Sequence, residues 1–150
     1  TWRSSSDIGG NPGSTDETNF QRWSIENLVS DPFSDSDHDG MSTLTEYSIG
    51  GDPNMVSSNT GITIRLEILD RDDAIDEYLI IDMTRRIGAD DVVFKIQMAQ
   101  SLNQWSDLIF PKSVIKSINN GNGTETVSYI VGKVNEIGDG MYFRKVVSLK

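Results

Sequence analysis

Cysteine is absent from the sequence, which excludes a disulfide framework and every metal site built on thiolates. Histidine is almost absent, and the single residue, His38, argues strongly against a histidine-based zinc site or catalytic dyad. No apolar run approaches the length of about 18 residues that a membrane-spanning helix requires. We therefore expect a chain that does not cross the membrane and whose structure depends on neither disulfides nor zinc.

The familiar catalytic motifs are missing as well. The sequence contains no G-x-S-x-G nucleophile turn, no metalloprotease helix and no phosphate-binding glycine loop. Its 150 residues, 36% of them hydrophobic, supply enough apolar material for one core but not for several. We expect this chain not to be an enzyme by itself.

Basic residues are scarce: 13 Lys and Arg stand against 23 Asp and Glu, a net charge of −10. General nucleic-acid binding needs a basic face, so no nucleic-acid partner is expected. The charge is also uneven along the chain. Residues 1–91 hold 6 basic and 19 acidic side chains (net −13), whereas residues 92–150 hold 7 and 4 (net +3). The acidic excess therefore belongs to the first part of the chain.

The first third of the chain predicts a linker and two helices. Residues 1–15 are rich in Ser, Gly, Asn and Pro and predict a linker, and the polar opening is typical of a piece of a longer protein. An apolar stripe predicts a helix over 17–29, starting after a Thr15 or Asp16 cap. A shorter helix is expected over 43–49, stopped by Gly50-Gly51.

From residue 61 onward the composition changes to β-branched and aromatic residues in short runs separated by turn residues. The runs are Ile62–Leu69, Tyr78–Arg85, Val92–Ala99, Ser113–Ile118, Thr124–Val131 and Met141–Leu149. Six strands at this spacing predict a mainly β fold, an antiparallel β-sandwich of immunoglobulin or fibronectin type III kind. We expect residues 16–53 to form a helix–loop–helix segment that packs with the β-sandwich of residues 54–150 as one module.

The loop between the two predicted helices has the pattern of a calcium site. Residues 35–46 read D-x-D-x-D-G-x₅-E, which matches the EF-hand loop at its constrained positions. Short carboxylates on alternate residues can converge on one cation, and a glycine supplies the positive φ that the turn requires. We predict a bound Ca²⁺ with these ligands: Asp35, Asp37, Asp39, the carbonyl of Met41, the hydroxyl or a held water of Thr43, and both oxygens of Glu46.

The loop and its surroundings resemble a known family. Asp35–Pro53 (DSDHDGMSTLTEYSIGGDP) is similar to a stretch near the C-terminus of many large secreted proteins of planctomycetes and verrucomicrobia. The similarity continues in FQRWSIENL, YLIIDMTRR, QSLNQWSD, NGTETV and YFRKVV, and it covers about residues 17–150. In the family the loop, which is EF-hand-like, dockerin-like or thrombospondin type 3-like, precedes a β-sandwich.

The resemblance implies a non-catalytic accessory module, secreted and attached to a catalytic domain that degrades polysaccharides. It favours binding of a polysaccharide, with an anionic or sulfated one expected because the β region is mildly basic. Two alternatives remain open at this stage. The chain could be a structural spacer or an anchoring or sorting module without glycan affinity, or a dockerin-like module that binds a protein.

Four side chains are candidates for contact with a glycan: Arg85 and Arg86 for sulfate or carboxylate, and Tyr78 and Trp105 for stacking on a sugar ring. The competing reading makes Trp105 a core anchor and most of the basic residues solubilising charge. A second acidic cluster over Asp70–Glu77 lacks the spaced glycine of a calcium loop, so a solvated hairpin loop is favoured there over a second ion site.

Overall fold

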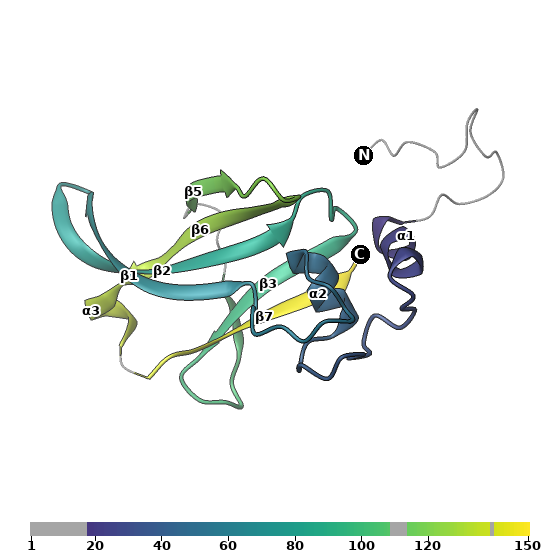
Figure 1. Ribbon diagram of the computed structural model, residues 1–150. Helices are drawn as coiled ribbons and strands as arrows, with labels where there is room; N and C mark the ends of the chain where they lie inside the picture. Colours follow the sequence, from purple (N-terminus) through teal and green to yellow (C-terminus); the bar gives the residue numbers. More distant parts are fainter. Residues whose placement is uncertain (1–17, 109–113, 139) are drawn as a thin grey trace.

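A computed structural model describes residues 18–108, 114–138 and 140–150. The predicted linker over residues 1–15 and both proposed cap residues, Thr15 and Asp16, lie outside this range. The described chain is mainly β: two antiparallel sheets pack as a sandwich, and two short helices precede them (Figure 1). The predicted fold class is confirmed at this level. No helix among the described residues is long and apolar enough to cross a membrane.

The elements follow one another in a simple order. The helices are α1 (Asn19–Glu26), α2 (Thr43–Ile49) and α3 (Val134–Ile137). The strands are β1 (Ile62–Arg71), β2 (Ala74–Arg86), β3 (Val92–Ala99), β4 (Ser106–Leu108), β5 (Val114–Asn119), β6 (Thr124–Lys133) and β7 (Tyr142–Leu149). One sheet has the order β1-β2-β6-β5 and the other the order β4-β3-β7. Helices α1 and α2 lie at one end of the sandwich, and the β1–β2 hairpin extends at the other (Figure 1).

The first helix is shorter than predicted. It begins after Thr18, which forms a capping box with Gln21, and it ends at the cap residue Asn27. Leu28, which lies within the predicted helix, instead has a positive φ of 58° and is 93% exposed. The capping box fixes the start locally, and the left-handed residue ends the helix before the predicted end at residue 29.

The second helix and most of the strands agree with the sequence prediction. Helix α2 has the predicted bounds and ends at Gly50, which adopts a left-handed conformation with φ of 78°. Strands β1 and β2 are longer than expected, because their hairpin closes through only two turn residues, Asp72 and Asp73, both with positive φ. Most of the acidic segment Asp70–Glu77 is therefore strand rather than loop. The short elements β4 and α3 were not predicted.

The described residues form three buried apolar clusters. The cluster between the two sheets contains Ile81, Met83, Ile96, Val127 and Tyr129. The cluster under the helices contains Phe20, Trp23, Val29, Leu44, Tyr47, Ala89 and Val92. A smaller cluster near the hairpin contains Tyr78, Ile80 and Ile130. Since the second cluster combines residues of both helices with residues at the start of β3, the helical segment and the sandwich share a core.

Polar contacts reinforce this junction. The buried carboxylate of Asp91 accepts hydrogen bonds from the backbone N–H of Phe20 at 2.7 Å and from the hydroxyl of Tyr47 at 2.9 Å. Arg86 donates from Nε to the Tyr47 carbonyl at 2.8 Å, and its guanidinium lies over the rings of Trp23 and Tyr47. Breaking such buried polar contacts is costly, so the helices are held on the sandwich in one arrangement.

Candidate metal centre

Three carboxylates converge in the loop between α1 and α2. Asp35, Asp37 and Asp39 each offer one oxygen, and these three oxygens all lie within 4.8 Å of one another. This is the one group of acidic, histidine or cysteine side chains with metal-ligand spacing among the described residues. Exposed acidic groups can gather without an ion, so the surroundings of the three carboxylates decide the interpretation.

Backbone amides of the tight turn hold these carboxylates in place. The N–H of Gly40 donates to Asp35 at 2.9 Å, and the N–H of Asp39 donates to both Asp35 and Asp37 at 3.2 Å. Asp39 accepts in turn from the N–H of Met41 at 2.8 Å. Gly40 has φ of 92°, a value that side-chain-bearing residues rarely adopt, so the glycine of the motif is needed for the backbone course.

The same amides act on the electrostatics of the loop. Burial alone would raise the pKa of Asp35, but the hydrogen bonds from the backbone of Gly40, His38 and Asp39 outweigh burial and hold that pKa below its ordinary value. These hydrogen bonds therefore favour the ionised form of Asp35. His38 is exposed, as expected for a residue whose side chain points away from the ion.

Glu46 provides the second and independent feature of the site. Its side chain lies on α2 and is 1% exposed, yet its Oε2 has no hydrogen-bond partner among the described residues. Burial, together with repulsion from Asp37, Asp39 and Asp35, raises the pKa of Glu46 to about 7. The Glu46 carboxylate thus lies within electrostatic range of all three loop carboxylates. None of the ion pairs found among the described residues involves Glu46.

Asp37 shows the same deficiency, because its buried Oδ2 also lacks a partner among the described residues. Buried carboxylate oxygens without partners cost several kcal/mol unless a cation or a donor compensates them. Only three buried side-chain polar atoms of the described chain lack a partner, and two of them belong to predicted ligands of this loop. A hard cation bound between Asp37 and Glu46 would compensate both.

The remaining two predicted ligands have different surroundings. Met41 is half-buried, and its N–H is engaged with Asp39, which leaves its carbonyl role a prediction. Thr43 is fully buried, and its hydroxyl donates to the Ser34 carbonyl at 3.1 Å. The N–H of Thr43 donates to the same carbonyl at 2.8 Å, so Thr43 closes the base of the loop. A ligand role for the Thr43 hydroxyl would compete with this contact.

The loop is also tied to the sandwich through its third carboxylate. The Oδ2 of Asp39 accepts a hydrogen bond of 2.9 Å from the N–H of Ser57, in the connection that leads into β1. Sequence reasoning missed this contact, because nothing in the spacing of Asp39 and Ser57 indicates it. An ion bound by Asp39 would therefore stiffen the connection into β1 as well as the loop itself.

The predicted glycan contacts are not gathered in one place. Tyr78 is 5% exposed and belongs to an apolar cluster, so its ring presents no face to a sugar. Arg86 is half-buried and committed to Tyr47 and Trp23, as described above. Both side chains serve the interior, a position that depends on a strand register that the sequence does not reveal.

The other two candidates are closer to the surface but are already paired. Arg85 donates from Nε to Glu125 on the neighbouring strand β6 at 2.7 Å. Trp105 is half-buried: its indole N–H donates to the Leu102 carbonyl at 2.8 Å, and the guanidinium of Arg144 lies 4.2 Å from the ring centroid. A sugar ring would have to displace Arg144 to stack on that face of Trp105.

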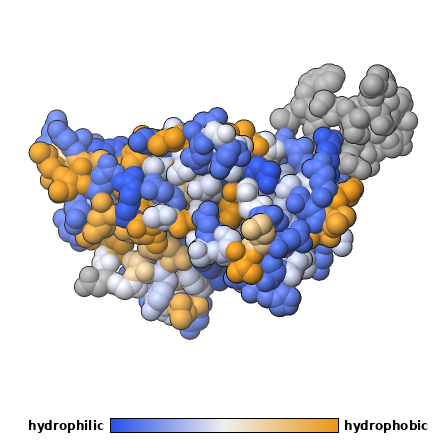
Figure 2. All heavy atoms as spheres, viewed as in Figure 1, coloured by the Kyte–Doolittle hydropathy of each residue, from blue (hydrophilic) through white to orange (hydrophobic). Residues whose placement is uncertain are grey.

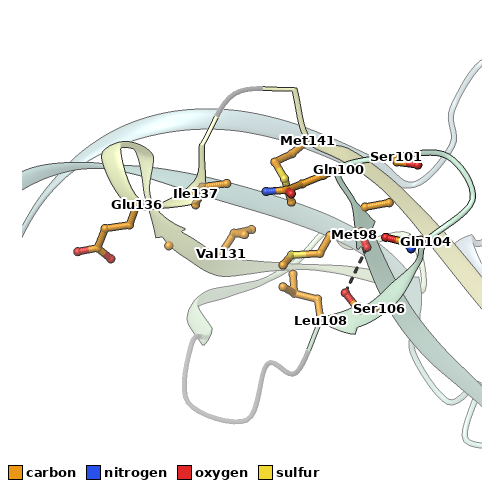
Figure 3. A pocket seen from close by; sticks show the side chains of 12 residues that line it. Met98, Gln100, Ser101, Gln104, Ser106, Leu108, Val131, Glu136, Ile137 and Met141 are labelled. Carbon is orange, nitrogen blue, oxygen red and sulfur yellow. Dashed lines mark hydrogen bonds between the residues drawn. The ribbon is translucent and has the colours of Figure 1, made fainter.

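A cleft of about 480 Å³ lies elsewhere, between the β3–β4 connection, β6 and α3 (Figure 3). Polar groups come from Gln100, Ser101 and Gln104, and apolar groups such as Met98 and Val131 line the same space. Sequence reasoning did not single out this cleft. The segment Gln100–Asp107 was noted for its resemblance, but its amides could not be placed around a cavity without the fold.

Comparison with protein-family models, with curated proteins and with solved structures found no match for this chain.

Proposed function

We propose that the chain is a non-catalytic module that binds one Ca²⁺ in the Asp35–Glu46 loop, and that the ion fastens the helical segment to the β-sandwich. The observation that carries this proposal is the buried Glu46 carboxylate, whose Oε2 lacks a partner among the described residues, beside three convergent aspartates. A cation at this point would satisfy the free oxygens of Glu46 and Asp37 together. It would also offset the repulsion among four carboxylates.

The donor set supports calcium among the divalent ions. Every candidate ligand is an oxygen, and oxygen donors suit the hard cations Ca²⁺ and Mg²⁺ rather than zinc or copper. A loop in which a carboxylate from a following helix closes the site matches the flexible coordination of Ca²⁺ by six to eight oxygens. Mg²⁺ demands stricter octahedral geometry and retains water, so we expect weaker binding of Mg²⁺.

Calorimetric titration of the full chain with CaCl₂ tests the proposal directly. We expect one site per chain in the wild type and a loss of at least tenfold in affinity in Asp37→Ala. Asp70→Ala is the control, because it also removes an aspartate, but one that lies on the β1–β2 hairpin outside the loop. Absence of calcium binding by the wild type, or equal affinities of the two variants, would contradict the proposal.

We propose as a second function that the module binds a polysaccharide for an attached, secreted catalytic domain. The resemblance of residues 17–150 to accessory modules supports this role. The cleft of Figure 3 supports it further, because the amides, hydroxyls and apolar side chains that line it suit the hydroxyls and ring carbons of sugars. With Tyr78 and Arg86 in the interior, we favour this cleft over those two residues as the contact site.

Affinity electrophoresis against alginate, carrageenans, fucoidan and neutral glucans separates this role from that of a spacer or a dockerin-like protein-binding module. Glycan binding predicts retardation by at least one of these polymers and its loss in the double variant Gln100→Ala/Gln104→Ala. Asn103→Ala, an exposed amide in the same connection that does not line the cleft, is the control. If no glycan retards the wild type at low or high salt, the spacer or protein-binding role is favoured instead.

We further propose that the sandwich is of immunoglobulin-like kind. The order β1-β2-β6-β5 corresponds to the A-B-E-D order of the constant-type immunoglobulin sheet. The second sheet differs. In the constant-type immunoglobulin fold its order is C-F-G, whereas here β3 lies between β4 and β7. The likeness supports the finer fold assignment for the four-stranded sheet, and a backbone structure by NMR would test it.

A further inference from the structure

Strand β1 forms one edge of the four-stranded sheet. It is ten residues long, and among the described residues it pairs with β2 alone. An exposed strand edge offers a row of unpaired N–H and C=O groups, and natural proteins usually shorten, twist or cover such an edge. Here the edge runs from the calcium-loop end of the sandwich to the tip of the β1–β2 hairpin (Figure 1).

The direction of these backbone groups follows from one hydrogen bond. The carbonyl of Gly61 accepts from the N–H of Thr84, so Gly61 faces the neighbouring strand. Backbone groups alternate in direction along an antiparallel strand. The residues with even numbers in β1 therefore direct their N–H and C=O groups away from β2. These residues are Ile62, Ile64, Leu66, Ile68 and Asp70.

The same alternate residues carry an exposed apolar row. Ile64, Leu66 and Ile68 are 46%, 55% and 69% exposed, and they share one face of the strand. Figure 2 shows hydrophobic surface gathered over the hairpin end of the molecule. A groove of about 250 Å³, lined by Ile64 and Leu66 together with Ile137 and Phe143, continues this surface. An edge that is both hydrogen-bonding and apolar is suited to strand addition.

We propose that β1 pairs antiparallel with β1 of a second copy of this chain, with Leu66 at the two-fold axis. The pairing would join two four-stranded sheets into one continuous sheet. Each outward N–H and C=O of the even-numbered residues would then find a partner. Ile64 of one copy would lie opposite Ile68 of the other at both ends of an apolar centre formed by the two Leu66 side chains.

The charges of β1 select this register and identify a second copy as the partner. With Leu66 at the centre, Arg65 of each copy lies opposite Glu67 of the other, so opposite charges face each other on both sides of the two-fold axis. Moving the centre by one residue places either two Arg65 or two Glu67 side chains directly opposite each other, and like charges in this position are destabilising. Arg65 and Glu67 already form an ion pair within the strand, so both lie on one face. β1 is thus complementary to itself in one register.

The absence of native cysteine allows a clean test by disulfide trapping of the full chain. In the proposed dimer the two Leu66 Cα atoms are about 5.5 Å apart, within the range that a disulfide requires. The two Ile68 Cα atoms are about 14 Å apart along the strands, too far for a bond. Under mild oxidation, we expect Leu66→Cys to form covalent dimer at least tenfold faster than Ile68→Cys, although Ile68 is the more exposed.

Sedimentation velocity of the unmodified chain over a concentration series completes the test. We expect a reversible dimer that Leu66→Lys abolishes and that Ile118→Lys, on the opposite edge strand β5, leaves intact. A wild type that is monomeric at every concentration would overturn the proposal and would leave the edge to a strand from a different protein. Trapping of Ile68→Cys as fast as Leu66→Cys would overturn it too, because that result indicates random collision or another register.

Discussion

The hydroxyl of Tyr47 donates a 2.9 Å hydrogen bond to the carboxylate of Asp91, although 44 positions separate the two residues in the sequence. Tyr47 directly follows Glu46, the predicted last ligand of the calcium loop. Helix α2 therefore connects the loop, through two adjacent side chains, with the start of strand β3. Any ion that positions Glu46 also positions Tyr47, so calcium binding and the docking of the helices are expected to be coupled.

The first prediction is that Glu46→Gln has opposite effects with and without calcium. In chelator at pH 8 we expect the substitution to raise the melting temperature, because it removes a buried carboxylate without a partner. In calcium we expect a lower melting temperature than for the wild type and a calcium affinity reduced at least tenfold. Glu26→Gln, on the exposed side of α1, is the control. A variant that is less stable under both conditions would contradict this role of Glu46.

The second prediction concerns pH. Burial and the nearby aspartates raise the pKa of Glu46 from 4.5 to about 7 in the absence of metal, so the native state holds this proton more tightly than the unfolded chain does. The stability of the metal-free protein should therefore fall as pH rises from about 4.5 through about 7. Calcium requires the ionised carboxylate, so affinity should rise over the same range and then level off. Calorimetric titrations with CaCl₂ between pH 5 and 8 measure this rise in calcium affinity. The same dependence of affinity on pH in Glu46→Gln would contradict the prediction.

The third prediction concerns Lys145 on β7. Burial lowers the pKa of its ammonium from 10.5 to about 8, so between these values the unfolded chain binds more protons than the native protein. Stability should therefore rise as pH increases from about 8 to about 10.5. Lys145→Met should remove this rise and should raise the stability at pH 7. Chemical denaturation at several pH values measures it, with the exposed Lys116→Met on β5 as the control. An unchanged rise in Lys145→Met would show that another group is responsible.

The fourth prediction compares backbone strain with side-chain chemistry in the loop. Gly40 has φ of 92°, whereas Met41 is expected to contribute only its carbonyl. Gly40→Val should weaken calcium binding more than Met41→Ala, because a β-branched residue resists this conformation. Gly121→Val, at φ of 77° in the β5–β6 turn, is the matched control and should leave calcium affinity unchanged. Equal calcium affinities of the two loop variants would mean that the loop does not require the observed backbone course.

The features that were predicted correctly are those that local chemistry determines. The bounds of α2 follow from the loop before it and from Gly50, which needs no distant partner to adopt its left-handed conformation. The convergence of Asp35, Asp37 and Asp39 likewise follows from their spacing within one tight turn. Strand β3 was predicted with its observed bounds because turn residues flank a run of β-branched and aromatic residues.

The features that were missed depend on contacts between distant segments. Arg86 was predicted to lie at the surface, but the fold places Tyr47 and Trp23 against its guanidinium. Both residues are at least 39 positions away from Arg86 in the sequence. The burial of Tyr78 depends on the register of β2 against β6, which shifts at a bulge between Leu79 and Ile80. A shift of one residue exchanges the two faces of a strand, so alternation in the sequence alone could not assign either side chain.

The central claim, that a bound calcium ion holds the helical segment on the sandwich, is tested most directly by thermal unfolding of the full chain over a range of free calcium concentrations. Calcium at about 1,000 times its dissociation constant should stabilise the native state by about 4 kcal/mol. This corresponds to a rise of about 8–16 °C in melting temperature for a chain of this size. We expect one cooperative transition that moves upward with calcium in the wild type and does not move in Asp37→Ala. A wild-type melting temperature that is the same in calcium and in chelator would contradict the account.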